Sequence, residues 1–417
     1  MPAHKTFASR KPEINFMNFD PDPEDDRFRD RIRAYVGTTL RELFPEHFQI
    51  DAPVHNYEKH DMRRWIRALN EKELLVPHWP QQWGGANWHP NWRRILEEEF
   101  SNARCPPTDT IGTDFVGPVL CAFGSSEQKR CYLPAIRNGD HFWCQGFSEP
   151  HAGSDIMSLR TTAVRDREHF IVNGQKLWTT NAHNADMMFA LLRIELPGIR
   201  KQQGLSFLLI DMRSTGVGVR PVIMIDGLHR VNEVSLQNVR VPTVNLVGEP
   251  GKGWVYARYL LTNERAVIAG LGQIKALLNN LREIARAEQK DGQALFADPL
   301  FRGQLSQLEI ELQALEFMEL RLLHSKADDS SVQILAPMLK LRGSELRQRV
   351  TELTLLTLGE RALEFPFSSE KDVWAAASTS PFALPATVNY LFQRSATLAG
   401  GTSEIQRNLI AGVALGL

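Results

Sequence analysis

The chain is poor in the features that mark disulfide-rich, zinc-binding, nucleic-acid-binding and membrane proteins. Its 417 residues include only four cysteines, which lie between Cys105 and Cys144 without CxxC spacing. This spacing argues against a disulfide framework or metal site and favours buried free thiols in a reducing compartment. The net charge of -1 provides no basic field for nucleic acid. No uncharged run approaches the ~20 residues of a membrane span.

The N-terminal residues also lack a targeting pattern. Met1–Phe16 carries scattered Lys and Arg but no apolar signal core, and acidic residues follow at once. We therefore expect a cytoplasmic protein. The chain has no internal repeat and no low-complexity segment. Its 43% hydrophobic content is ordinary for a globular protein, and its length suits two or three domains.

The spacing of apolar residues divides the chain into three regions. Helical periodicity predicts helices at 25–44, 59–72, 91–102, 112–123 and 126–136. Short alternating segments from 159 to 239 predict a β-barrel or sandwich of about 100 residues, with a hairpin turn at Asn173-Gly174. Helical spacing then returns at 254–290, 299–327, 330–358 and 385–398. The fold class is therefore α+β, in the order helical, sheet, helical.

Two neighbouring stretches carry the features of a site for a planar cofactor. Gln145-Gly-Phe-Ser-Glu-Pro-His-Ala-Gly-Ser-Asp155 contains one Pro and two Gly, which forbid a helix and favour a compact loop with free backbone donors. Gly174-Gln-Lys-Leu-Trp-Thr-Thr-Asn181 places a large flat ring beside two hydroxyls. An aromatic wall, hydroxyl donors and a loop that lets the backbone approach a pyrophosphate together suit a planar dinucleotide cofactor.

Four stretches in the same order resemble signatures of the acyl-CoA dehydrogenase family. They are Gly124…Glu127-Gln-Lys-Arg-Cys-Tyr-Leu-Pro-Ala-Ile-Arg-Asn-Gly139, Phe147–Asp155, Asn173–Asn181 and Gly400-Gly-Thr-Ser-Glu-Ile-Gln-Arg407. The resemblance covers nearly the whole chain from the Trp79–Gly85 loop onward. It implies an N-terminal α-helical domain of residues 1–140, a middle β-barrel domain of residues 141–248 and a C-terminal four-helix-bundle domain of residues 249–417.

The resemblance also implies FAD as cofactor and assigns contacts to it by motif position. Ser148 would supply a hydroxyl contact to the isoalloxazine edge, Trp178 would lie beside the ring, and Thr180 would approach N5. The full set of implied flavin contacts is Gln145, Phe147, Ser148, Ser154, Trp178, Thr180, Thr402 and Glu404. Taken singly, the serines fit plain turn chemistry and Trp178 fits a core aromatic. No metal site is expected.

The family reaction removes a proton from Cα of an acyl thioester and passes a hydride from Cβ to flavin N5, which yields a trans-2-enoyl thioester. Much of the family carries the base as a Glu where this chain has Gly400. A bacterial branch instead places the Glu on a helix of the C-terminal domain just before an Arg, and Glu264-Arg265 matches that arrangement. Glu264 is therefore the expected base, and Arg265 and Ser154 the expected substrate contacts. A solvent-exposed helical Glu is the plain alternative.

The far end of the cofactor departs from the family pattern. Homotetramers of the family hold the adenosine end with an Arg and a Phe at one helix end and with a Gln at another. Here Glu288 and Asp291 stand where the Arg and Phe would lie, and Leu356 replaces the Gln. A carboxylate repels a pyrophosphate. Arg286 could take the role, fewer contacts could hold the dinucleotide, or the chain could pair with a different subunit, as in bacterial α2β2 relatives.

The expected function is therefore FAD-dependent α,β-dehydrogenation of an acyl-CoA in lipid metabolism. By resemblance, an electron-transfer flavoprotein accepts the electrons, and the chain forms a homodimer, a homotetramer or an α2β2 assembly. Two alternatives stay open: a non-catalytic partner subunit of such an enzyme, and a flavin monooxygenase of the same fold. Neither nucleic acid nor a membrane is an expected partner.

Overall fold

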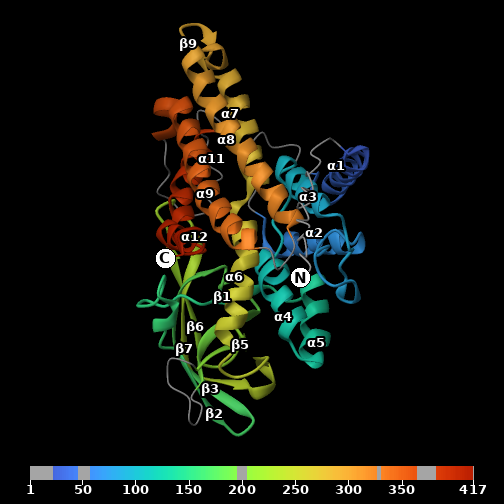
Figure 1. The fold of residues 1–417 in the computed structure, drawn as a ribbon, viewed down its shortest axis with the longest axis vertical. Coiled ribbons are helices and arrows are strands. Elements are labelled where there is room, and N and C mark those ends of the chain that lie inside the picture. The colour runs from blue at the N-terminus through green and yellow to red at the C-terminus, as the bar shows by residue number, and fades with distance from the viewer. Residues whose placement is uncertain (1–21, 46–56, 195–203, 326–329, 364–381, 417) are drawn as a thin grey trace, which may run out of the picture.

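The computed structural model describes residues 22–45, 57–194, 204–325, 330–363 and 382–416, without the side chains of 90, 262–268, 330–332 and 415. Within these residues helices come first, then a sheet, then a second set of helices, which confirms the order expected from the sequence (Figure 1). The sheet and the second helical region occupy opposite ends of the molecule. The N-terminal helices lie beside their junction (Figure 1).

The N-terminal helices pack through regularly spaced apolar faces. They are α1 (Pro23–Leu43), α2 (Lys59–Glu71), α3 (Pro90–Asn102), the π-helical segment η3 (Ile111–Val116), α4 (Gly117–Phe123) and α5 (Ser126–Arg137). The side chain of Asp22 accepts the Glu24 N–H at the start of α1, and Ser125 and Gln128 form a reciprocal capping box at the start of α5. These caps satisfy donors that the first helical turn leaves unpaired.

The middle region is one twisted sheet of eight strands. They are β1 (Trp143–Gly146), β2 (Thr162–Asp166), β3 (His169–Thr180), β4 (Met187–Ile194), β5 (Leu205–Asp211), β6 (Val217–Ile223), β7 (His229–Pro242) and β8 (Leu246–Val247). The strand order is β6-β7-β3-β2-β4-β5-β8, with β1 paired to β4. Among the described residues this path has two open ends, so the strands do not close into the expected barrel.

The expected hairpin turn at Asn173-Gly174 is wrong. Asp166 pairs with His169 across the β2–β3 hairpin, so the turn is Arg167-Glu168, directly after β2, and Arg167 has a φ of +54°. Asn173 and Gly174 instead lie inside β3, at a shift in its register with β7. The Asn-Gly pair marks an irregularity in a long strand, because the same left-handed freedom that suits a turn also suits a β-bulge.

The C-terminal region is a bundle built around four long helices. They are α6 (Gly253–Ala269), α7 (Leu271–Ala287), α8 (Pro299–His324) and α9 (Ser330–Leu358), followed by α11 (Ala383–Gln393) and α12 (Ser403–Leu415). A short hairpin of β9 (Gln289–Lys290) and β10 (Gln293–Ala294) follows α7. The helix expected over 254–290 is broken at Gly270, whose φ of +57° ends α6 and starts α7 at a new angle.

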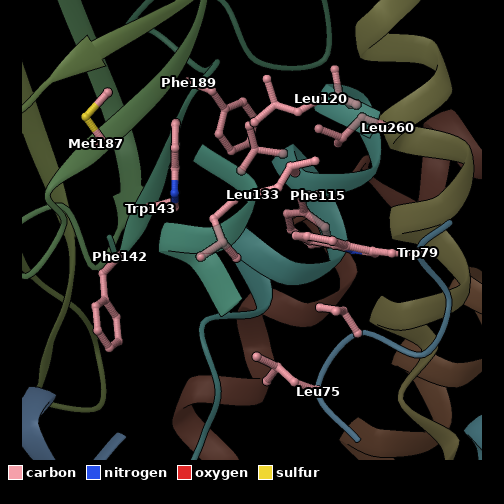
Figure 2. Packing of buried hydrophobic residues seen from close by; sticks show 14 of the residues in the cluster. Leu75, Trp79, Phe115, Leu120, Leu133, Phe142, Trp143, Met187, Phe189 and Leu260 are labelled. Carbon is pink, nitrogen blue, oxygen red and sulfur yellow. The ribbon is translucent and has the colours of Figure 1, made fainter. Parts of the chain in front are cut away.

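One apolar core joins the N-terminal helices to the sheet and to α6. It extends from Leu75 and Trp79 through Trp143 and Phe189 to Leu260 (Figure 2). A second core covers the other face of the sheet and a third fills the bundle. Because one core spans the junction, the sheet and the helices around it form a single rigid support for a site there.

The four cysteines differ in exposure, although the sequence predicts that all of them are buried. Cys144 is buried, but Cys105 and Cys121 are only half-buried and Cys131 is exposed, so the expectation of buried thiols holds for one cysteine of four. All four are free thiols.

No helix in the described part of the chain is both long and apolar enough to cross a lipid bilayer.

Candidate functional site

The loop at Gln145–Asp155, called the Pro/Gly loop below, begins where β1 ends. Contacts along its length anchor it to the rest of the chain. Phe147 is 6% exposed and contacts Phe189 edge-on, with ring centroids 5.5 Å apart. Glu149 and Ala152 exchange backbone hydrogen bonds of 2.8 and 3.1 Å. The backbone of the loop is therefore anchored on the sheet, which leaves Ser148 half-exposed and Ser154 exposed above it.

A buried ion pair joins this loop to β3. Lys176 is fully buried, and its Nζ donates to Glu149 Oε1 at 2.8 Å, to Leu191 O at 2.7 Å and to Phe147 O at 3.3 Å. Glu149 also accepts the N–H groups of Arg160 and Thr161. All three ammonium protons and both carboxylate oxygens are thus used, which is the condition for a buried pair to be tolerated.

The protonation of the pair follows from its surroundings. Burial lowers the pKa of Lys176 to about 8, although Glu149 favours its charged form. Burial by itself would raise the pKa of Glu149, but the Lys176 charge and the N–H donors hold that pKa below its ordinary value. The two groups are therefore a charged pair at neutral pH. That pair fixes the loop at Phe147–Glu149 against the strand two residues before Trp178.

The end of β3 presents an aromatic ring and a hydroxyl to solvent. Trp178 is 58% exposed, and its φ is +62°, a left-handed conformation that is uncommon outside glycine. Thr180 is exposed on the same strand end. The Leu177 N–H donates to Ser148 O at 2.9 Å, so the loop and the strand end are also joined through their backbones. Trp178 is therefore a surface ring held in a fixed place, and not the core aromatic that a lone Trp usually is.

The same end of the sheet contacts the bundle. Arg230 of β7 places its guanidinium 4.4 Å from the centroid of the Phe392 ring of α11. Arg230 O also accepts the Asn181 N–H at 3.0 Å. Leu228 packs on Leu384 and Val388 of α11 in a small buried cluster. The strand end that carries Trp178 and Thr180 therefore lies at the junction of the sheet with the C-terminal helices.

A cavity of about 800 Å³ opens at this junction. It is bordered by α3, the 104–110 segment, α7, α9 and α11, and it reaches Arg230 beside the Trp178 strand end. Gly270, at the break between α6 and α7, lines it as well. A volume of this size is within the range of pockets that hold drug-sized ligands.

Charged and polar side chains form much of the cavity wall. Asp114 accepts from Arg93 Nη2 at 2.8 Å, and Arg93 Nε also donates to Glu97 at 3.0 Å. Burial, together with the Arg93 charge, lowers the pKa of the neighbouring His78 to about 4, so this imidazole is neutral. Asp114 and Glu97 line the cavity with Arg347, whose Nη2 donates to Ala269 O at 2.8 Å. The wall can hydrogen-bond a polar ligand as well as enclose an apolar one.

The structure does not place every expected residue beside the Gln145–Asp155 loop and the strand end that carries Trp178. Thr402 caps α12, where its hydroxyl accepts the Ile405 N–H, and Glu404 is exposed in the first turn. Their hydrogen bonds are local to α12, at the end of the bundle nearest the sheet in the view of Figure 1. Glu264 and Arg265 are in α6, but their side chains lie outside the described residues. Their roles stay predictions.

Glu288 and Leu356 lie in the region where the adenosine end of FAD is expected, and they differ from each other in exposure. Glu288 is 8% exposed and pairs with Arg361 of the short helix η8 (Gly359–Leu363). Leu356 is 67% exposed. The carboxylate at 288 is therefore turned inward and neutralised within the chain. It does not face outward as a bare charge.

Two residues of this arrangement, Glu149 and Lys176, were missed by the sequence analysis. Both are inside the recognised motifs, and an acid in one motif with a lysine in the next was the available signal. Their pairing was not visible because 27 residues separate them. A buried Asn232, which donates to Thr179 O at 3.0 Å, carried no sequence signal.

The helical–sheet–helical order, with this loop and tryptophan near the junction, is the fold class expected for the acyl-CoA dehydrogenase family. The sequence matches the models for the acyl-CoA dehydrogenase N-terminal domain over residues 22–140, the middle domain over 144–239 and the C-terminal domain over 251–415. The chain belongs to the acyl-CoA dehydrogenase family. The division at residues 140 and 248 stays a prediction.

Individual relatives agree with this placement. The acyl-CoA dehydrogenase IpdE1 of Mycobacterium tuberculosis is 34% identical, over 94% of this chain and 97% of its own length. The structure of the ChsE4–ChsE5 complex from the same organism superposes with a TM-score of 0.80 at 28% identity, covering 96% of this chain and 99% of that one. The Tcur3481–Tcur3483 steroid ACAD superposes with a TM-score of 0.80 at 25% identity, over 96% and 99% of the two chains.

Proposed function

We propose that the chain is an FAD-dependent acyl-CoA dehydrogenase that oxidises an acyl-CoA thioester to the trans-2-enoyl-CoA. The observation that carries this proposal is the Glu149–Lys176 brace, which holds the Pro/Gly loop against the strand end bearing Trp178 and Thr180 beside a ligand-sized cavity. A fixed, exposed aromatic ring with a hydroxyl beside it fits the wall of a planar cofactor.

Within this proposal, named residues hold FAD. Gln145, Phe147 and Ser148 contact the ring edge, Ser154 approaches the pyrophosphate, Trp178 forms the wall and Thr180 approaches N5. Thr402 and Glu404 complete the set from α12. When bound, FAD would supply the hydride acceptor. The half-exposed hydroxyl of Ser148 and the exposed hydroxyls of Ser154 and Thr180 are accessible donors for such a ligand.

Glu264 is the proposed base that removes the α proton, and Arg265 and Ser154 are proposed substrate contacts. Glu264 precedes Gly270 by six residues on α6, about 9 Å along the helix axis, and Gly270 lines the cavity. The alternative position for the base is Gly400, whose φ is +65°. A Glu there would carry a left-handed backbone at a cost of about 1–2 kcal/mol. This conformation favours a base outside the 400–402 turn.

The cavity is the proposed acyl site. Its polar wall admits oxygen-bearing as well as hydrocarbon acyl groups, and the steroid ACAD among the structural neighbours makes a steroid thioester one candidate class. An electron-transfer flavoprotein is the proposed acceptor of the electrons.

An α2β2 assembly with a related subunit is the proposed quaternary arrangement. In this chain Glu288 is committed to Arg361, and Leu356 offers no donor to a dinucleotide. The chain therefore supports the isoalloxazine end of FAD better than its adenosine end. Both structural neighbours described above are named as pairs of different chains. A partner with its own adenosine-binding residues would complete the site.

The test is anaerobic titration of the purified, flavin-loaded protein with a panel of fatty, dicarboxylic, aromatic and steroid side-chain acyl-CoA thioesters. Bleaching of the flavin band by one class, with formation of the enoyl-CoA, is the expected result. Glu264→Gln should retain FAD and lose roughly 10²–10⁴-fold in bleaching rate, the usual contribution of a general base. Glu352→Gln, an exposed carboxylate on α9 outside the cavity lining, is the matched control and should bleach normally.

Bleaching by Glu264→Gln at the wild-type rate would refute the assignment of the base. A non-catalytic partner subunit is the second candidate, and the Glu288–Arg361 pair favours it. An FAD content well below one per subunit, with no bleaching by any thioester, would establish that alternative.

A further inference from the structure

The end of β3 owes its shape to a β-bulge. Lys176 pairs with Val234 of β7 and Thr179 with Asn232, so Leu177 and Trp178 together face the single residue Glu233. An extra residue on one strand bends that strand and re-aims its side chains. The bulge is what gives Trp178 its left-handed φ of +62° and its 58% exposure. Without the bulge, the alternation of the strand would direct Trp178 to a different face.

On the side of the bulge before Leu177, the Pro/Gly loop holds β3 in place. The N–H of Leu177 is released from the ladder with β7 and donates to Ser148 O at 2.9 Å. Lys176 Nζ donates to Phe147 O and to Glu149. These contacts define where the bulge begins. They do not hold the residues that follow Trp178.

After the bulge, one buried carboxamide holds the strand. Asn232 is fully buried, and its Nδ2 donates to Thr179 O at 3.0 Å. A backbone carbonyl only accepts hydrogen bonds, so this contact fixes which end of the carboxamide faces the strand. Nδ2 also lies 3.2 Å from His183 Nδ1, and Oδ1 lies 2.7 Å from His229 Nε2. Both ends of the carboxamide are thus bonded, and a flip of the group would place Oδ1 against the Thr179 carbonyl oxygen.

His183 and His229, which contact the two ends of the Asn232 carboxamide, also contact each other. Their rings stack with centroids 4.0 Å apart and a tilt of 33°. The bond to Oδ1 requires that His229 Nε2 carries a proton, and the bond from Nδ2 requires that His183 Nδ1 accepts. His183 follows the Trp178–Asn181 segment and His229 begins β7. The support therefore spans the strand end from both sides.

We propose that Asn232 is a positioning residue for the proposed flavin wall: its carboxamide, oriented by His229, holds Thr179 and so fixes Trp178 and Thr180 on either side. The proposal rests on the proposed function for the identity of the ligand, but the hydrogen bonds and the bulge do not depend on it. Thr179 is the residue between the ring and the hydroxyl, so a shift of its backbone moves both. A displacement of about 1 Å in a reacting geometry can slow a reaction by roughly 10²-fold.

The same ladder offers a matched control. A second register shift lies between Val172 and Gly174, where Asn173 and Asn238 bond each other: Asn238 N donates to Asn173 Oδ1 at 2.8 Å, and Asn173 Nδ2 donates to Asn238 Oδ1 at 3.2 Å. Asn238 has a φ of +52°, so this bulge is also braced by an asparagine. It lies nearer the start of β3, before Trp178 in the sequence. Asn173→Asp makes the same chemical change as Asn232→Asp at a bulge that the proposal does not involve.

The experiment compares Asn232→Asp, His229→Phe and Asn173→Asp with the wild type. Hydrogen exchange of the peptide covering 177–183 is measured on the protein without FAD, and anaerobic flavin reduction on the loaded protein. Asn232→Asp places a carboxylate against the Thr179 carbonyl. It should raise exchange in that peptide about tenfold, retain FAD, alter the flavin absorption band and slow reduction about tenfold or more at unchanged KM. His229→Phe keeps the ring stack, removes the donor to Oδ1 and should give a smaller effect of the same sign.

Two results would overturn the proposal. One is wild-type exchange and wild-type flavin reduction in Asn232→Asp or, if that variant does not fold, in His229→Phe. The other is an equal change in Asn173→Asp, which would show a general effect of loosening the sheet. A wild-type protein that binds no FAD or reduces it with no thioester would instead refute the proposed function. The exchange measurement on the FAD-free protein keeps these two failures apart.

Discussion

Two carboxylate–cation pairs lie at the two ends of the proposed cofactor path, and they differ in burial and in partners. At the ring end, the side chains of Lys176 and Glu149 are 0% and 5% exposed, and four hydrogen bonds to backbone groups surround the pair. At the adenosine end, the side chains of Arg361 and Glu288 are 44% and 10% exposed. The ring end is specified within this chain. At the far end, the Glu288 carboxylate is neutralised by Arg361 within this chain.

The physical reason for the contrast is the cost of desolvating a charge. A fully buried pair is favourable only when every proton and lone pair is used, so its presence fixes the geometry around it. A half-exposed pair is screened by water and fixes little. Substitutions at the two ends should therefore differ in their effects on stability and on flavin binding.

Lys176→Met should break the ring end. It leaves the Glu149 carboxylate buried without its cation, and we expect a loss of about 3–5 kcal/mol in the free energy of unfolding, together with loss of FAD binding. Denaturant unfolding and the flavin content of the purified protein measure the two effects. Lys290→Met, which removes an exposed partner of Asp298, is the control and should change neither. A Lys176→Met protein with wild-type stability and full flavin would show that the brace does not hold the loop.

Asp109→Asn tests how much a buried carboxylate without a cation lowers the free energy of unfolding near β1. Asp109 accepts the Trp143 N–H at 3.0 Å, and burial raises its pKa to about 7 from 3.8. The folded protein therefore binds more protons than the unfolded chain between about pH 4 and 7, and stability falls as pH rises through this window. The loss is at most about 4 kcal/mol. Asp109→Asn should remove that part of the pH dependence.

Unfolding measured from pH 5 to 8 separates the outcomes for Asp109. The wild type should lose stability relative to Asp109→Asn as pH rises, and the two curves should be closest at pH 5. Asp166→Asn, an exposed carboxylate on β2, serves as the control with an unchanged profile. Parallel wild-type and Asp109→Asn curves would mean that the burial of Asp109 carries no such cost.

Arg361→Met should disturb the far end only slightly. The Arg361 side chain is 44% exposed, so water screens its pair with Glu288, and we expect a loss of about 1 kcal/mol in the free energy of unfolding. The flavin absorption band should not change. Arg286→Met is the informative comparison, because Arg286 is exposed and stacks 5.0 Å from the Phe296 ring. If Arg286→Met weakens FAD binding and Arg361→Met does not, Arg286 takes the pyrophosphate role and the need for a different partner subunit disappears.

Leu356→Gln should have the smallest effect on the isolated chain. The side chain is 67% exposed, so unfolding should change by no more than about 0.5 kcal/mol. If the far end faces a second subunit, the variant should instead weaken assembly, which light scattering over a dilution series would detect. Ile223→Gln, at an exposed position of the sheet, is the matched control. Equal assembly of both variants and the wild type would place the partner elsewhere.

Local sequence patterns predicted the elements well where one physical cause dominated. The helix at 330–358 was predicted with the bounds that α9 has, and α2, α3 and α5 agree within one or two residues. Their apolar spacing and caps act within a few residues of each other. The continuous helix over 254–290 failed because Gly270 bends the chain where α6 meets α7. The turn at Asn173-Gly174 failed because pairing with β7 continues past it.

The class of the protein follows from the amino-acid sequence. The four family signatures, the helical–sheet–helical order and the pair of motifs at 145–155 and 174–181 can all be read along the chain. How those motifs act together depends on the tertiary structure. The pairing of Lys176 with Glu149, the bulge that exposes Trp178, the carboxamide of Asn232 behind it and the inward turn of Glu288 each join residues distant in sequence. Such contacts depend on burial and register, which arise only when the sheet and the two helical regions pack together.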